Sequence, residues 1–179
     1  MSAVVKWGLI TGLVYVVYSL VMNLLGLQDP ANTNFIRGML FNTVFFAATL
    51  YTVYLGVKEF RNEENGGMLT MGEGFIKGLQ ITLIAAVISG IFSIIYFYFI
   101  DPDMINQIRE SAEQQWEENN MSDEQIETAS KVMGFMMNPW IMTAMSVVMV
   151  IFWGVIKGLI VGAILKTPPK TPIVEVPLT

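Results

Sequence analysis

Long apolar runs separated by short polar segments dominate the sequence. The four longest runs cover residues 7–27, 35–57, 75–100 and 140–165. At 1.5 Å per residue, helices of these lengths measure roughly 31 to 39 Å, which is enough to cross a hydrocarbon core of about 30 Å. The first run is too long for a signal-peptide core and precedes no A-x-A-like cleavage site, so we expect it to be retained. The pattern predicts an all-α membrane protein with four transmembrane helices.

The basic residues give these helices a predicted direction. If the N-terminus lies inside, seven basic residues fall on the inner side, namely Lys6, Lys58, Arg61, Lys77, Lys157, Lys166 and Lys170. Three fall on the outer side, namely Arg37, Arg109 and Lys131. Because lysine and arginine collect in cytoplasmic segments, we predict that both termini are cytoplasmic. Residues 28–34 then form a tight outer turn, and residues 58–74 form an inner loop whose Asn-Gly-Gly sequence favours a turn.

The segment between the third and fourth runs, residues 101–138, holds nine of the fifteen acidic residues. Asp101 followed by Pro102 is typical of a helix start, and apolar residues then recur at helical spacing as far as Trp116. Ser122 opens a capping-box pattern, S-D-E-Q, at the head of a second amphipathic stretch. We therefore predict an acidic helical hairpin on the extracytoplasmic side of the membrane.

Three interpretations of this hairpin are open. The favoured one is a solvated hairpin folded over the helix bundle. The second is a docking surface for a basic partner protein, and the carboxylates that would form it are Glu110, Glu113, Glu117 and Glu118. The third, a metal site, is the least favoured because the segment lacks the D-x-[DN]-x-[DN]-G spacing of an EF-hand loop. The excess of carboxylates also argues against a hairpin that lies flat on anionic lipid.

A short glycine pattern, G-x-x-x-G-L, occurs in three of the four runs. Its glycines are Gly8 and Gly12, Gly74 and Gly78, and Gly154 and Gly158, the last pair continuing to Gly162. Glycines four residues apart share a helix face and allow close approach, which matters in lipid because packing drives helix association there. We predict that the first, third and fourth helices pack tightly in the inner half of the membrane and that the second is more peripheral. The recurrence reflects either an old duplication or chance in a glycine-rich composition.

Two lysines, Lys77 and Lys157, lie within or close to the spans. Intramembrane charge is usually functional, but long lysine side chains near helix ends also extend to the water interface. We favour such snorkelling for both lysines, with contact to a lipid headgroup or to a partner carboxylate as the alternative.

The polar span residues are scattered along the sequence, and we expect them to form interhelical hydrogen bonds; they are Tyr15, Asn23, Asn42, Gln80, Ser89 and Ser146.

The composition restricts the chemistry further. The chain of 179 residues is 54% hydrophobic and only 14% charged, whereas roughly a quarter of the residues of a soluble protein are charged. We expect one membrane domain, residues 1–166, followed by a mobile cytoplasmic tail at 167–179 with four prolines. Histidine and cysteine are absent, which excludes disulfides, thiolate catalysis and histidine-based triads. We predict no cofactor, no metal and no nucleic-acid partner.

Several motifs together carry a family resemblance. Residues 65–78 (NGGMLTMGEGFIKG) open the third run, FIDPD follows at 99–103, MSDEQ lies at 121–125, and a glycine-rich final run ends in Lys166. In order and spacing these parts are similar to a bacterial membrane family catalogued as domain of unknown function 4199. The resemblance implies four transmembrane helices in a bacterial inner membrane. It implies no catalytic or binding residues.

Three classes of function follow from these features. The leading hypothesis is a non-enzymatic accessory, assembly or interaction component that contacts membrane lipids and docks a protein partner on the acidic hairpin. The alternative is a small transporter or channel, which would form a homo-oligomer because four helices enclose little volume. A lipid-modifying enzyme is the least favoured class, since Asp101 and Asp103 are the only candidates for acid–base chemistry near the membrane.

Overall fold

The computed structural model describes residues 1–27 and 35–167. These residues are helical apart from short connections and contain no strand, and their helices are α1 (Ala3–Leu24), α2 (Phe35–Glu59), α3 (Met71–Ile95), α4 (Met104–Glu118), α5 (Asp123–Met136) and α6 (Pro139–Leu165). The turn expected at 28–34 and the proline-rich tail from 168 onward lie outside the described residues, so the structure leaves both as predictions.

Four of the helical segments are long and apolar enough to cross a membrane. They are α1, α2 with its extension to Glu64, α3 with its extension to Ile100, and α6. Their lengths range from 22 to 30 residues, and at 1.5 Å per residue even the shortest measures about 33 Å. The expectation of four spans is confirmed, and the chain is that of a multi-pass membrane protein.

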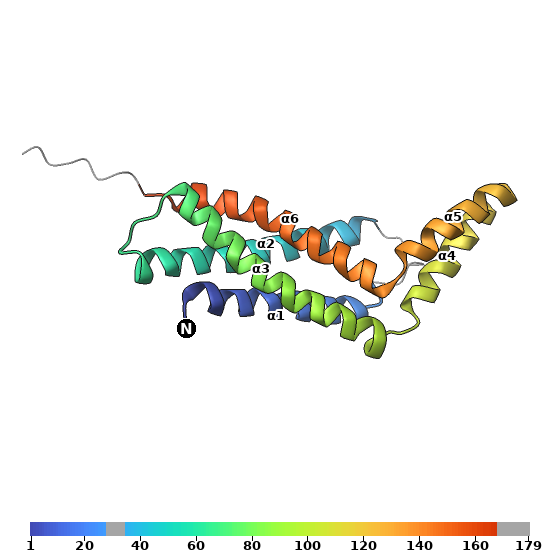
Figure 1. Cartoon of the computed structure of the whole chain (residues 1–179), viewed down its shortest axis with the longest axis horizontal. Helices are drawn as coiled ribbons and strands as arrows, with labels where there is room; N and C mark the ends of the chain where they lie inside the picture. The colour runs from blue at the N-terminus through green and yellow to red at the C-terminus, as the bar shows by residue number, and fades with distance from the viewer. Residues whose placement is uncertain (28–34, 168–179) are drawn as a thin grey trace, which may run out of the picture.

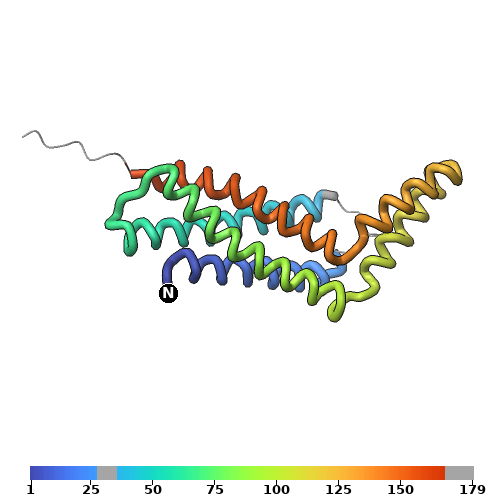
Figure 2. Tube along the Cα trace, in the orientation of Figure 1, coloured from blue at the N-terminus to red at the C-terminus, as the bar shows by residue number. Residues whose placement is uncertain are grey.

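The four long helices form one elongated bundle, and α4 and α5 project from one end of it (Figure 1). We call this the hairpin end, and we call the opposite end, which carries the N-terminus and the α2–α3 connection, the loop end (Figure 2). The closest helix pair is α3 with α6, followed by α3 with α1. Helix α2 packs mainly on α1 and makes smaller contacts with α6 and α3. Helix α3 is therefore the element shared by the two tightest interfaces.

The connection at the loop end is shorter than the sequence suggested. Helix α2 continues as a π-helical turn, Phe60–Glu64, and α3 already begins at Met71. The expected turn is present, because Gly66 and Gly67 have φ angles of 60° and 79°, which suit glycine. The Thr70 side chain and Glu73 form a reciprocal capping box, which the sequence T-M-G-E encodes. This cap is why α3 starts one turn earlier than predicted.

The start of the hairpin also differs from the expectation. Helix α4 begins at Met104, so Asp101 is not its N-cap and Pro102 is not its first residue. The reason is that α3 extends through a π-helical turn to Ile100, and the Asp101 N–H donates to the Tyr96 carbonyl at 3.0 Å. Asp101 therefore closes the preceding helix. The predicted capping box at Ser122 is present at the start of α5.

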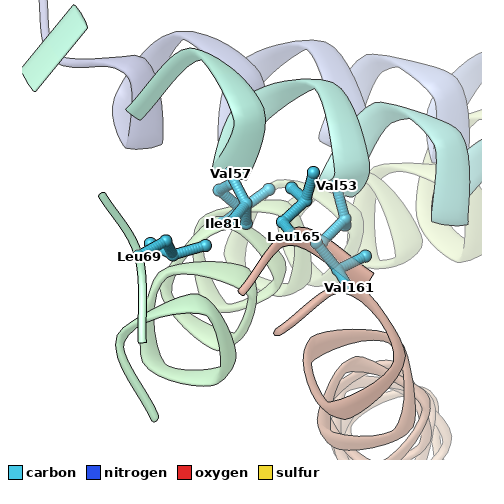
Figure 3. Close-up of a cluster of buried hydrophobic side chains, with 6 residues drawn as sticks. All are labelled: Val53, Val57, Leu69, Ile81, Val161 and Leu165. Atoms are coloured by element: carbon cyan, nitrogen blue, oxygen red, sulfur yellow. The ribbon is translucent and has the colours of Figure 1, made fainter. Parts of the chain in front are cut away.

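The buried apolar core lies at the loop end of the bundle. Its fully buried members come from α2, α3, α6 and the connection before α3, and they are Val53, Val57, Leu69, Ile81, Val161 and Leu165 (Figure 3). Helix α2 thus supplies two residues of this core, which differs from our expectation that it would be peripheral in this half. Gly56 explains the difference, because its missing side chain brings α2 against Trp7 and Ile81.

Candidate functional site

The backbones of α3 and α6 approach each other closely at a row of small residues. Gly74 faces Gly162 and Gly78 faces Gly158, so a Cβ atom added at either α3 glycine would lie 2.7 or 2.9 Å from a backbone Cα atom of α6. One step farther toward the hairpin end, Gly154 faces Thr82. We call these three facing pairs the glycine ladder. Its antiparallel register, with steps of four residues on both helices, is the spacing that lets two helices approach closely.

The third copy of the glycine pattern does not join this ladder. Gly8 and Gly12 of α1 pack against the side chains of Ile84 and Ile88, which lie nearer to the hairpin end of α3. The three copies therefore serve two separate interfaces of α3 rather than a common contact. All seven predicted glycines lie in helix contacts, and their role in the fold is to remove bulk at those contacts.

The four candidate carboxylates of the hairpin, Glu110, Glu113, Glu117 and Glu118, are all exposed on α4. Neither α4 nor α5 contains a buried residue. The hairpin projects away from the bundle (Figure 1), so the favoured expectation that it folds over the bundle is wrong. An open cavity of about 640 Å³ lies along α5 and the end of α4, and its lining includes Trp116, Met133 and Met136. The apolar stripes of the hairpin are therefore half-buried or exposed, and none of their residues is fully buried in the described chain.

Lys77 lies near the loop end of α3, as its early position in the run suggested. Its Nζ atom is 4.6 Å from the centroid of the Phe60 ring, a distance at which a cation and an aromatic face attract. The side chain is partly exposed. Contact between Lys77 and a lipid headgroup stays a prediction.

Lys157 does not extend to an interface, contrary to our favoured interpretation. Only 2% of the residue is exposed. Its Nζ atom lies 3.4 Å from the Tyr15 hydroxyl oxygen and 5.2 Å from the centroid of the Phe46 ring. Within the part of the chain that the structure describes, no carboxylate is paired with it. Helices α1 and α2 cover this face of α6, and that covering is why the lysine is enclosed.

Lys157 forms part of the wall of a cavity of about 820 Å³, which we call the lysine cavity. Its other lining residues come from α1, α2 and α6, and they are Tyr15, Gly38, Met39, Asn42, Thr43, Phe45, Phe46, Met149, Val150 and Trp153. A smaller cavity of about 320 Å³ shares Tyr15, Phe45 and Val150 with it. The lysine cavity combines one cation and a few polar groups with apolar and aromatic walls, which is the usual make-up of a ligand site.

Sequence reasoning missed this convergence. It treated Tyr15 and Asn42 as scattered, whereas the packing of α1 on α2 brings both into the same cavity. Asn42 also accepts a hydrogen bond from the Tyr18 hydroxyl at 3.2 Å. The available signal was the pair Trp153 and Lys157, which four-residue spacing places on one face of α6. That signal does not reveal which helices face the pair.

A second polar cluster ties α1 to α2 at the loop end. Glu59 accepts hydrogen bonds from the Lys6 ammonium at 2.7 Å and from the Trp7 indole N–H at 2.8 Å. The Ala3 N–H donates to the Glu64 carboxylate. Each member of the cluster already has a partner, so its role is to position the helix ends.

One of three comparisons with known proteins finds a match. The family described as "Protein of unknown function (DUF4199)" matches residues 6–167. The chain belongs to this family. No curated protein and no solved structure matches the chain. The match to DUF4199 covers α1 from Lys6 onward, the other three long helices, the hairpin and the lysine cavity, so each candidate site lies within the family region.

Proposed function

We propose that this DUF4199 protein is a non-enzymatic membrane protein that docks a basic partner protein on its hairpin. The observation that carries the proposal is the projection of α4 and α5 beyond the bundle, where a partner can approach them from several sides (Figure 1). We further propose that the membrane is the bacterial cytoplasmic membrane and that the hairpin faces away from the cytoplasm.

The distribution of basic residues supports this orientation. At the loop end lie Lys6, Lys58, Arg61, Lys77 and Lys166, whereas the hairpin end carries Arg37, Arg109 and Lys131. The orientation rule weighs lysine and arginine close to the membrane, and it places the loop end in the cytoplasm. Exposed amphipathic aromatic residues at the base of the hairpin, Tyr98 and Trp140, support a lipid–water boundary at that level.

The absence of native cysteine makes the orientation simple to test. Single-cysteine variants Gln114→Cys on the hairpin and Asn62→Cys at the loop end both place the thiol on an exposed residue. In intact cells, a membrane-impermeant maleimide is expected to label Q114C and to leave N62C unlabelled until the cells are permeabilised. The reverse order of labelling would contradict the proposed orientation.

Two features of the hairpin support a basic partner with an apolar residue at its centre. The exposed carboxylates of α4 attract positive charge over a distance of about 8 to 10 Å at ordinary salt. The hairpin also carries the open apolar cavity near Trp116, whose lining includes Glu124, and Val132 and Phe135 of α5 are 56% and 70% exposed. Exposed apolar groups rimmed by charges are typical of interaction surfaces. Charge would provide the specificity, and burial of the apolar groups would provide the affinity.

Site-specific photocrosslinking tests the partner. A photoreactive residue at Gln114 is expected to capture a protein in native membranes, whereas the same residue at Asn62 is not. The capture should be lost with Gln at 110, 113, 117 and 118, and retained with Asp at the same four positions, since aspartate keeps the charge. Crosslinks to lipid alone, or equal capture by the Gln and Asp variants, would refute docking through these carboxylates.

The lysine cavity favours a second candidate, a small transporter or channel. A cavity that lies between the helices of a bundle is a common location for a bound solute. Purified protein in proteoliposomes would then carry solute or ion flux without any partner. A lipid-modifying enzyme instead requires lipid turnover that is lost in Asp101→Asn and Asp103→Asn, and we expect both variants to be indistinguishable from the unmodified protein in that assay.

A further inference from the structure

We propose that the lysine cavity binds a membrane amphiphile whose anionic head, a carboxylate or a phosphate monoester, pairs with Lys157. The lysine is 2% exposed, and in the described chain it has the Tyr15 hydroxyl rather than a carboxylate as its nearest polar partner. A buried ammonium is costly unless it is paired, and a neutral hydroxyl at 3.4 Å compensates only part of that cost. An anion in the cavity would supply the missing charge and a charge-assisted hydrogen bond.

The walls of the cavity point to a ligand with an apolar body. Phe45, Phe46 and Met149 line it together with Trp153, and its volume of about 820 Å³ suits a molecule much larger than a free anion. Asn42 and Thr43 add polar atoms, but their side chains already donate to backbone carbonyls of α2. The cavity therefore suits a ligand that has one anionic group and a long apolar chain.

The source of the ligand follows from the side on which the cavity opens. Three of its lining residues are also exposed on the surface of the bundle: Met39 by 57%, Met149 by 51% and Trp153 by 42%. In a membrane span, such a surface faces lipid rather than water. The opening between α2 and α6 therefore admits molecules that are dissolved in the bilayer. A lipid with a small head fits this route, whereas a free anion would have to cross hydrocarbon.

The orientation of the bound amphiphile follows from the position of Lys157 along α6. The lysine lies eight residues before Leu165, the last residue of α6, and this spacing places it about 12 Å from the loop end of the helix. The rest of the cavity extends from there toward Gly38 near the hairpin end of α2. The head would lie on the loop side and the chain toward the centre of the membrane, which is the orientation of lipids in the leaflet at the loop end. The headgroup must be small because it loses its hydrating water when it enters the membrane as far as Lys157, and that loss is costly for a charged group.

Native mass spectrometry of the full-length protein in an uncharged detergent tests the proposal. The probes are oleate, phosphatidic acid and inorganic phosphate, and the variants are Lys157→Met and the control Lys58→Met, which removes an equal charge from an exposed residue at the loop end. We expect one oleate or phosphatidic acid to be retained by the unmodified protein and by K58M. We expect at least about tenfold weaker retention by K157M, since a hydrogen bond to a charged group is worth a tenfold factor or more. Equal retention by K157M and K58M, or binding of inorganic phosphate alone, would overturn the proposal.

A second pair of variants keeps the test valid if K157M fails to fold. Gly38 lines the cavity and has open space where a side chain would begin, and Gly72 near the start of α3 has open space as well. Gly38→Leu is expected to fill part of the cavity and weaken retention of oleate severalfold, whereas Gly72→Leu leaves retention unchanged. Full retention by G38L would show that the amphiphile binds elsewhere on the protein.

Discussion

Replacing Gly158 by alanine tests the glycine ladder between α3 and α6. A Cβ atom at this position would lie 2.9 Å from the backbone carbonyl oxygen of Phe75 and 3.2 Å from its ring. The ring can rotate, but the carbonyl oxygen belongs to the backbone of α3 and moves only with its helix. The alanine variant must therefore separate the two helices or distort one of them.

The expected cost follows from the required shift. Ordinary van der Waals contact begins at 3.4 Å, so α3 and α6 must separate by about 0.5 Å near Gly158. A gap of 0.5 to 1 Å forfeits roughly a quarter to a half of the dispersion energy of each contact along the interface. Overpacking of a well-packed interior costs about 1 to 3 kcal/mol, and we expect about 2 kcal/mol for Gly158→Ala. Gly158→Leu should lie at or beyond the upper end of this range.

The free energy of unfolding is measured by titration with a denaturing detergent in mixed micelles, with helical circular dichroism as the signal. Gly38→Ala is the matched control because its new methyl group enters open space. Leu159→Ala is the second control, since Leu159 is 43% exposed toward lipid and lipid tails are as apolar as leucine. If Gly158→Ala is as stable as Gly38→Ala, then the glycine ladder does not hold α3 against α6 as we argue.

Three further predictions use contacts at other levels of the bundle. Ser122→Ala removes the cap of α5 and should cost about 1 kcal/mol locally, seen as faster hydrogen exchange in the first turn of α5 with no change in the four spans. Thr11→Val removes a buried hydroxyl that lies 2.9 Å from the Thr52 hydroxyl oxygen and 2.7 Å from the Trp7 carbonyl oxygen, and it should lower the free energy of unfolding by about 0.6 kcal/mol; an unchanged value would contradict a stabilising role for this hydroxyl. Glu59→Gln weakens the link between the start of α1 and the end of α2. It should speed hydrogen exchange at the N-terminus of α1 and shift the fluorescence emission of Trp7 to longer wavelength. An unchanged Trp7 emission spectrum would contradict this link.

The elements of this fold were predictable because their causes are local. A run of about 20 or more apolar residues needs lipid wherever it lies in the chain, so the four spans follow from length and hydropathy alone. The capping box at Ser122 is also local, because its donor and acceptor are three residues apart. The start of α4 was mispredicted because Asp101, which was expected to cap α4 with its side chain, instead closes the π-helical turn at the end of α3 through its backbone N–H.

The sequence by itself thus determined that the chain has four spans, an acidic hairpin between the last two, and glycine pairs that permit close helix packing. Only the tertiary structure decided which glycines face one another, because α3 offers two faces and α1 occupies the one that α6 does not. Only the tertiary structure enclosed Lys157, whose environment depends on α1 and α2 rather than on its own neighbours in α6. The physical reason is common to both cases. Helix formation depends on hydrogen bonds within a few residues, whereas burial depends on which distant segments come to cover a face.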